Sequence, residues 1–272
     1  MLVSSRRLRG FAIPALVAGA TTLAAGCGIS QREEVELGRQ YAAEINRELP
    51  IVDDPATNRY INLLGDRIAR QGGRGLDYTF YIVNTEAVNA FAVPGGYIYV
   101  NRGLIEETDN LSELAGVIAH EVGHVEERHA VEQIERMQRA NLGLSMAYIL
   151  LGRAPGTLEQ VGIQVAGAAI FAGFSRAAEN EADAVAVSLL VQAGINPNGL
   201  VTFFEKLLQE RERRPSTIEQ WFSTHPLTED RIENTRAVIR RIPEGQMRDL
   251  IVNTRQYEEF KARLRQYRPP PQ

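Results

Sequence analysis

The chain has 272 residues, of which 44% are hydrophobic and 24% are charged, as in an ordinary soluble globular protein with a substantial core. Its formal net charge of −4 argues against nucleic acid as a partner. The single cysteine excludes an intramolecular disulfide and a metal cluster built from several thiolates.

The first 26 residues have the pattern of a bacterial lipoprotein signal peptide. Arginines within residues 6–9 precede an uncharged apolar run over residues 11–25, which suits a signal peptide and is short for a membrane span of roughly 20 residues. The run ends in Leu23-Ala24-Ala25-Gly26-Cys27, which resembles a lipobox, where the cysteine is lipidated and becomes the new N-terminus. We predict removal of residues 1–26, a lipid on Cys27 and a tether over residues 27–34. A plain signal peptide with a chance cysteine is the alternative.

Two helices and two strands are predicted next along the chain. Apolar residues recur near a helical period over residues 35–49, and a second helix is expected within residues 54–73. β-branched and aromatic residues predict strands at residues 78–83 and 97–100. Between the strands, Pro94 belongs at a sheet edge or in a turn, because proline cannot donate to a central ladder.

Helices are expected to dominate the second half of the chain. The patterns predict a long helix from Ser112 to about Ala140 and another from about Ser175 to Gln192. Between them lie two apolar stretches, residues 142–151 and 161–174, each too short to span a bilayer. They are expected to be buried helices or, alternatively, a lid or membrane-contacting hairpin beside a functional site.

Taken together, these elements predict a mostly helical α+β fold with a small β-sheet. The sequence contains no internal repeat and no interior linker. We therefore predict one domain over residues 35–266, followed by a Pro-rich tail at residues 267–272.

Two of the four histidines predict a metal site. His120 and His124 flank Glu121 in the spacing His-Glu-x-x-His. Residues four apart on a helix differ by about 40° in direction, so both imidazoles face one point in space, as zinc requires. Glu121 is then placed beside the metal, where its carboxylate can take a proton from the water that zinc activates. A surface helix that carries two histidines by chance is the alternative.

A catalytic zinc needs a third protein ligand, and His129 is one candidate. In the pattern His-Glu-x-x-His-x-x-Gly-x-x-His, a glycine turns the chain so that the last histidine returns to the metal. Here Glu127 stands at the glycine position and Ala130 at the histidine position. On a continuous helix, His129 would point about 140° away from His124, so we predict a structural or solvated role for it.

A downstream glutamate is the better candidate, and two compete. Glu179 shares a helix face with Asp183, one turn later, whereas Glu181 lies about 200° around the helix and has Val185 in the equivalent place. A carboxylate at Asp183 can accept the ring N–H of a zinc histidine, which fixes the tautomer of that histidine. We therefore predict Glu179 as the third ligand and Asp183 as the residue that orients a ligand histidine.

The order of the motifs resembles one family of zinc endopeptidases, gluzincins that include HtpX-like proteases, mitochondrial Oma-type proteases and type I CAAX prenyl proteases. Four pieces match in family order between about residue 30 and about residue 265: Asn89-Ala90-Phe91 with Pro94-Gly95-Gly96, residues 120–124, Ser175-Arg176 with Glu179 and Ala182-Asp183, and Thr224-His225-Pro226 with Arg231 and Ile232. The resemblance implies one zinc ion held by His120, His124 and Glu179. It also implies a catalytic Glu121, with Asp183 and Arg231 supporting the ligands.

The resemblance further implies a substrate site. Residues 89–93 are expected to form an edge strand along which a polypeptide substrate lies extended, in contact with Asn89, Ala90, Phe91 and Ala92. His225 is expected to act at the zinc without being one of its three core ligands, from an extended conformation that the following proline favours. It would either donate a hydrogen bond to the developing oxyanion or close over the metal as a fourth ligand in a resting state. A packing or capping histidine is the alternative.

Within the family, the chain is most similar to small periplasmic lipoproteins. It lacks the long transmembrane helices of HtpX-like and prenyl proteases, which argues against prenylated or membrane-embedded substrates, and no tetratricopeptide tail is evident. We expect a zinc-dependent endopeptidase that is lipid-anchored at Cys27, faces the periplasm and hydrolyses misfolded or misassembled cell-envelope proteins. Gly28 is not acidic, which favours the outer over the inner membrane. The alternatives are an assembly chaperone with tightly gated or rare proteolysis and a lipoprotein that uses zinc structurally; the oligomeric state is left open.

Overall fold

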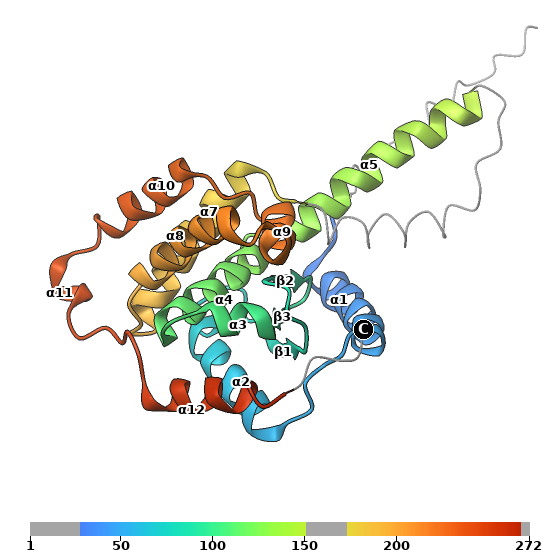
Figure 1. Cartoon of the computed structure of the whole chain (residues 1–272). Coiled ribbons are helices and arrows are strands. Elements are labelled where there is room, and N and C mark those ends of the chain that lie inside the picture. Colours follow the sequence, from blue (N-terminus) through green and yellow to red (C-terminus); the bar gives the residue numbers. More distant parts are fainter. Residues whose placement is uncertain (1–27, 151–172, 268–272) are drawn as a thin grey trace, which may run out of the picture.

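Figure 1 shows the computed structural model, in which residues 28–150 and 173–267 are described. The predicted signal peptide, the lipidation site Cys27 and most of the apolar stretch 161–174 lie outside the described residues. Among the described helices, none is both long enough and apolar enough to cross a membrane.

The first helix, α1 (Gln31–Glu48), begins inside the range that was predicted to be a tether. The reason is a capping box: the Ser30 hydroxyl accepts a hydrogen bond from the Glu33 backbone N–H at 3.3 Å, and the Glu33 carboxylate accepts one from the Ser30 backbone N–H at 2.8 Å. Helix α1 packs beside the sheet (Figure 1) and its Gly38 lies directly against the backbone of Pro94, where a larger residue would clash.

Helix α2 (Pro55–Ala69) starts as the sequence predicts, with Asp54 as its N-cap and a proline at its first position. The sheet that follows contains β1 (Thr79–Val83), β2 (Ala90–Val93) and β3 (Tyr97–Asn101) in the spatial order β1-β3-β2. Strand β1 is parallel to β3, and β2 is antiparallel to it. Strand β2 therefore lies at an edge of this sheet.

After the short helix α3 (Arg102–Glu107), the chain enters α4 (Leu111–Glu126), which lies in the centre of the molecule (Figure 1). All residues of α4 from Leu111 to Val125 are buried. Helices α7 and α8 approach it closely because two of its residues are glycines. A Cβ at Gly123 would lie 2.7 Å from the Ala182 carbonyl oxygen on α7, and one at Gly116 would lie 2.8 Å from Leu200 Cα on α8.

Helix α4 ends at Glu126, and a separate helix, α5 (His129–Leu150), begins three residues later and extends away from the rest of the molecule (Figure 1). The prediction of one continuous helix from Ser112 to about Ala140 is therefore wrong. Arg128 adopts a left-handed conformation with φ 59° at the break. Its side chain is held by the buried carboxylate of Glu34, with Nε 3.0 Å from Oε2, and by the backbone oxygen of Ile29.

The remaining helices follow along the chain, and α7 and α8 pack directly against α4. They are α7 (Arg176–Gln192), α8 (Asn198–Arg213), α9 (Pro215–Thr224), α10 (Glu229–Ile239), α11 (Glu244–Met247) and α12 (Arg255–Leu264). The largest apolar cluster joins α2, the sheet, α4, α7 and α8, and α12 covers α2 through the stacked rings of Tyr60 and Phe260, 4.3 Å apart. The predicted mostly helical α+β fold with a small sheet is confirmed.

Candidate metal centre

Four side chains with metal-binding atoms meet beside α4. They are His120 and His124 on α4, Glu179 in the first turn of α7, and His225 at the C-terminal end of α9. One potential ligand atom of each lies within 4.8 Å of the others, and all four side chains are buried. The chain thus brings together residues that are up to 105 positions apart.

The two histidines of α4 aim the same ring atom at one point. Nε2 of His120 lies 3.0 Å from Nε2 of His124, and Nε2 of His124 lies 3.4 Å from Oε1 of Glu179. Two imidazoles and a carboxylate that converge in this way form a donor set that suits zinc. Glu121 lies on the same turn as His120, and within the described residues neither of its buried carboxylate oxygens accepts a hydrogen bond. A buried carboxylate beside these ligands that accepts no hydrogen bond from the described residues fits a group that handles protons at a metal.

Helix α7 carries both acidic residues that the sequence singled out. Ser175 caps its N-terminus by accepting a hydrogen bond from the Ala178 backbone N–H at 3.2 Å. Because α7 touches α4 at Gly123, the first turn of α7 places Glu179 next to both α4 histidines. Asp183 follows one turn later on the same face, as predicted from the spacing.

Asp183 contacts the ring nitrogen of His120 that faces away from the cluster. Its Oδ1 lies 2.8 Å from His120 Nδ1, which leaves Nε2 of His120 directed at the other ligands. Arg231 on α10 lies 2.7 Å from Asp183 through Nε and also forms an ion pair with Glu179. Burial opposes ionisation of Asp183, but the Arg231 guanidinium and the His120 ring outweigh it and lower the pKa of Asp183 to about 2.

Burial and the charges of neighbouring side chains shift the pKa values of the cluster residues. Burial raises the pKa of Glu121 and lowers that of His124 well below its ordinary value. Burial also opposes the ionised form of Glu179, yet His225 and Arg231 hold the pKa of Glu179 well below its usual range. For His225, the carboxylates of Glu121 and Glu179 outweigh burial and raise the pKa. Two buried carboxylates thus face the buried imidazoles of the cluster.

His225 lies nearer to the cluster than the sequence alone could establish. Its Nδ1 is 3.2 Å from Glu179 Oε1 and 3.3 Å from His120 Nε2, while its Nε2 is 3.4 Å from Glu121 Oε1. It follows the last residue of α9 in a non-helical conformation, with φ −124° and ψ 85°, consistent with the restriction that Pro226 imposes. This position is compatible with a fourth ligand and with a hydrogen-bond donor to a reacting group.

His129, which was predicted to be structural or solvated, is buried against His124. Its Nδ1 lies 2.9 Å from His124 Nδ1, and its Nε2 lies 3.4 Å from Glu181 Oε2. The angular argument against His129 assumed a continuous helix, and the break at Arg128 removes that assumption. Arg128 carries a Cβ, so the sequence held no glycine to signal the turn.

The predicted edge strand lies beside the cluster. The Asn89 carbonyl accepts a hydrogen bond from the Asn101 backbone N–H at 3.0 Å. In an antiparallel pair, the backbone groups of β2 then face β3 at Asn89 and at every second residue after it. The N–H and C=O groups of Ala90 and Ala92 therefore point away from β3. Phe91 instead stacks its ring on Tyr99 at 4.9 Å, which makes its side chain part of the core.

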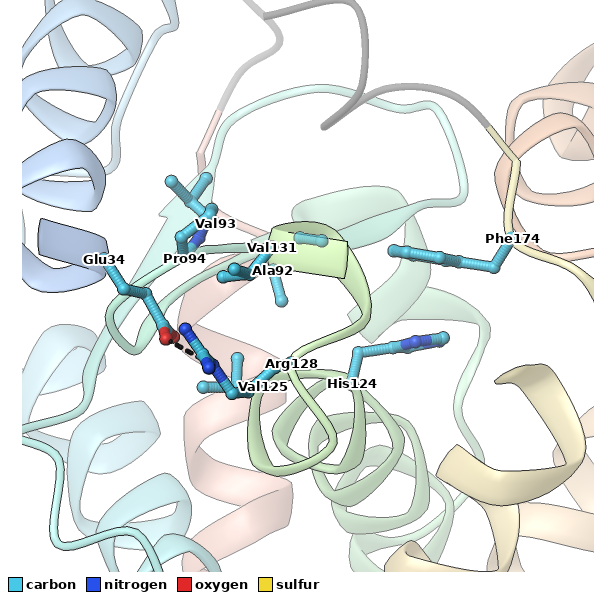
Figure 2. Close-up of a pocket in the computed structure, with 10 residues that line it drawn as sticks. Glu34, Ala92, Val93, Pro94, His124, Val125, Arg128, Val131 and Phe174 are labelled. Carbon is cyan, nitrogen blue, oxygen red and sulfur yellow. Dashed lines mark hydrogen bonds and ion pairs between the residues drawn. The ribbon is translucent and has the colours of Figure 1, made fainter. Parts of the chain in front are cut away.

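A pocket joins the edge strand to the cluster (Figure 2). Ala92 and His124 both line it, together with Val131 at the start of α5 and Phe174. Figure 2 shows the Phe174 ring lying face to face with His124, and their centroids are 4.1 Å apart. The backbone N–H of Phe174 is bonded to the Thr224 carbonyl at 3.2 Å, so the Phe174 ring is tied to the chain that carries His225.

Comparison with known proteins identifies the family of this chain. Residues 55–239 match the family model described as peptidase family M48. The chain belongs to peptidase family M48. The matched range includes the His-Glu-x-x-His segment, α7 and the His225 loop.

Three known proteins are similar to this M48 chain over different shares of its length. It is 31% identical over 261 residues to the beta-barrel assembly-enhancing protease of Escherichia coli (strain K12), a match that covers 90% of this chain and 52% of the relative. It is 33% identical over 220 residues to metalloprotease LoiP of the same strain, covering 76% and 81%. It is 33% identical over 153 residues to mitochondrial metalloendopeptidase OMA1 of Arabidopsis thaliana, covering 56% and 30%. The chain thus spans about half the length of the beta-barrel assembly-enhancing protease that it matches.

Proposed function

We propose that this protein is a zinc-dependent endopeptidase, with His120, His124 and Glu179 as the metal ligands and Glu121 as the general base. One observation carries the proposal. Two histidine Nε2 atoms 3.0 Å apart and a buried carboxylate converge on one point beside Glu121, whose oxygens lack hydrogen-bond partners among the described residues.

When bound, zinc supplies Lewis acidity, which polarises a carbonyl and lowers the pKa of water toward 7. The rest of the reaction belongs to the chain. Glu121 takes the proton of the attacking water and later returns it to the leaving amine. Burial favours this role because it raises the proton affinity of the Glu121 carboxylate. Asp183 and Arg231 hold His120 and Glu179 in place, so that the donor set does not rearrange during turnover.

The substrate is proposed to lie along β2. Ala90 and Ala92 face away from β3 with their backbone groups, and Ala92 lines the same pocket as His124. An extended peptide that pairs with these groups would bring a scissile bond to the metal centre. Slower amide hydrogen exchange at Ala90 and Ala92 when an inhibitory peptide binds would support this placement; unchanged exchange there would contradict it.

His225 keeps the two roles that the sequence left open. It lies 3.3 Å from His120 Nε2 and 3.4 Å from Glu121 Oε1, so it reaches both a ligand and the general base. If His225 donates to the oxyanion, His225→Ala lowers kcat about 10²–10³-fold with zinc retained, a loss equivalent to about 3 kcal/mol. If it closes the site as a fourth ligand, the same variant raises activity or self-cleavage. Unchanged kinetics would leave it a packing residue.

The cellular setting is proposed from the first residues and from the names of the relatives. The segment that ends at Cys27 has the lipobox pattern, and the names of the bacterial relatives refer to β-barrel assembly and to metalloproteolysis. We infer a periplasmic enzyme that is anchored to the outer membrane by lipid on Cys27. Cys27→Ser is expected to abolish incorporation of radiolabelled palmitate and to release the protein from membranes. If this variant stays equally membrane-bound, the anchor lies elsewhere.

Misfolded or misassembled polypeptides of the cell envelope are the proposed substrates. The site is closed in this structure, since His120, Glu121 and Glu179 are each 0% exposed and Phe174 covers His124. That observation favours a second candidate, an assembly chaperone that rarely cleaves. Cleavage of unfolded casein by the purified full-length protein separates the two. Cleavage that a chelator stops and added zinc restores supports the peptidase, whereas binding of casein without any cleavage would favour the chaperone.

A further inference from the structure

The His129 side chain occupies a position that the proposed reaction does not use. It is 4% exposed and lies in the first turn of α5, immediately after the break between α4 and α5. Its Nδ1 faces Nδ1 of His124 at 2.9 Å, and its Nε2 faces Glu181 Oε2 at 3.4 Å. One imidazole thus connects a candidate zinc ligand with a carboxylate that is 58% exposed.

The proton positions in this chain of contacts follow from the metal site. His124 directs Nε2 at the other ligands, so as a neutral ligand it carries its proton on Nδ1. A hydrogen bond between two Nδ1 atoms needs one donor and one acceptor, so Nδ1 of His129 has to be unprotonated. The proton of neutral His129 is then on Nε2, where Glu181 can accept it.

We propose that His129 is a positioning residue for the metal centre, which accepts a hydrogen bond from His124 and is itself held in one tautomer by Glu181. This inference rests on the proposed zinc site. With this role for His129, each histidine ligand on α4 has its own hydrogen-bond acceptor: Asp183 for His120, at 2.8 Å, and His129 for His124. The acceptor for His120 is charged and buried, whereas that for His124 is a neutral ring linked to a half-exposed carboxylate.

The fold holds His129 at this position through contacts remote from the metal. Arg128 takes the left-handed conformation that reverses the chain, and its guanidinium is paired with Glu34 on α1. Glu34 also forms a two-pronged pair with Arg74, with distances of 2.8 and 2.7 Å. On the other side of the site, Phe174 stacks on the His124 ring. His124 is thereby fixed at its face by Phe174 and at its Nδ1 edge by His129.

Two substitutions of His129 separate hydrogen bonding from space filling. In His129→Asn, the amide oxygen takes the place of Nδ1 and can still accept from His124. In His129→Gln, the amide reaches the place of Nε2, and the acceptor next to His124 is lost. Removing the outer partner of a metal ligand costs about 10–100-fold in metal affinity. We therefore expect His129→Gln to weaken zinc binding about 10–100-fold and His129→Asn to retain most of the wild-type affinity.

The measurement is competition between the metal-free full-length protein and a chelating dye for Zn²⁺, with melting temperature as a readout of folding. Glu132→Gln is the matched control, because Glu132 lines the same surface pocket as His129 and Glu181. Among the described residues, its carboxylate pairs with Arg136 and contacts neither His124 nor His129. Zinc affinity equal to that of the wild type in His129→Gln, or equally weakened in both His129 variants, would overturn the role of His129.

A spectroscopic readout does not depend on the variants. In the zinc-loaded wild-type protein, ¹⁵N chemical shifts should show neutral His129 protonated on Nε2 and His124 protonated on Nδ1. A proton on Nδ1 of His129 would contradict the inference. A wild-type protein that binds no zinc tightly would instead refute the proposed metal site itself, so the two failures are distinguishable.

Discussion

Replacing Glu121 with glutamine is expected to lower the rate of peptide hydrolysis by about 10²–10⁴-fold, the usual contribution of a general base. The amide keeps the size of the side chain but cannot take a proton from water. Among the described residues the Glu121 oxygens accept no hydrogen bond, so glutamine breaks none and changes only the 3.4 Å contact of Glu121 Oε1 with His225 Nε2. Zinc content and melting temperature are therefore expected to stay near the wild-type values.

Three measurements on Glu121→Gln belong together: cleavage of a quenched fluorescent peptide, bound zinc by elemental analysis, and thermal unfolding. Loss of bound zinc in parallel with activity would place Glu121 among the ligands and remove its assignment as the base. Full activity with zinc present would require another proton acceptor in the site.

Glu179→Ala is expected to have the largest effect on metal binding. It removes one of three protein ligands, so its cost should exceed the loss of about 100-fold that removal of an outer partner reaches at most. Glu181→Ala is the matched control two residues away on the same helix. Among the described residues the Glu181 carboxylate contacts His129, at 3.4 Å, and no cluster residue, and it is 58% exposed. Because it can act on the metal only through His129, zinc occupancy at saturating metal should be unchanged in Glu181→Ala.

Zinc content of the two purified variants distinguishes these roles, with unfolding curves as a check on α7. Removal of Glu179 also deprives Arg231 of one ion-pair partner, although Asp183 still holds it. Equal zinc occupancy in the two variants would show that the assignment of Glu179 by helix face is wrong.

The spacing of residues along single helices carried much of what the sequence could predict. His120 and His124 face one point because they are four residues apart, and Glu179 is distinguished from Glu181 by its shared face with Asp183. The observed distances agree with both predictions of direction. The helices themselves were also predictable, since Asp54 and Ser175 act as N-caps.

Features that depend on contacts between distant segments were not predictable from local patterns. The break between α4 and α5 needs the pairing of Arg128 with Glu34, 94 residues earlier, and no glycine marks it. The burial of His129 follows from that break. Likewise, the loop residue His225 meets His120 only because α9 packs where it does, 105 residues later in the chain. Helical periodicity contains no information on either contact.

The central claim is that a single metal ion, held by His120, His124 and Glu179, is required for peptide hydrolysis. Its most direct test is a titration of the metal-free full-length protein with zinc while cleavage of unfolded casein is followed. Activity is predicted to be absent at the start and to rise in proportion to added zinc until one ion is bound per chain. In Glu121→Gln the same single ion should bind without activity. Cleavage by the metal-free protein, or full activity in a His120→Ala, His124→Ala double variant, would contradict the claim.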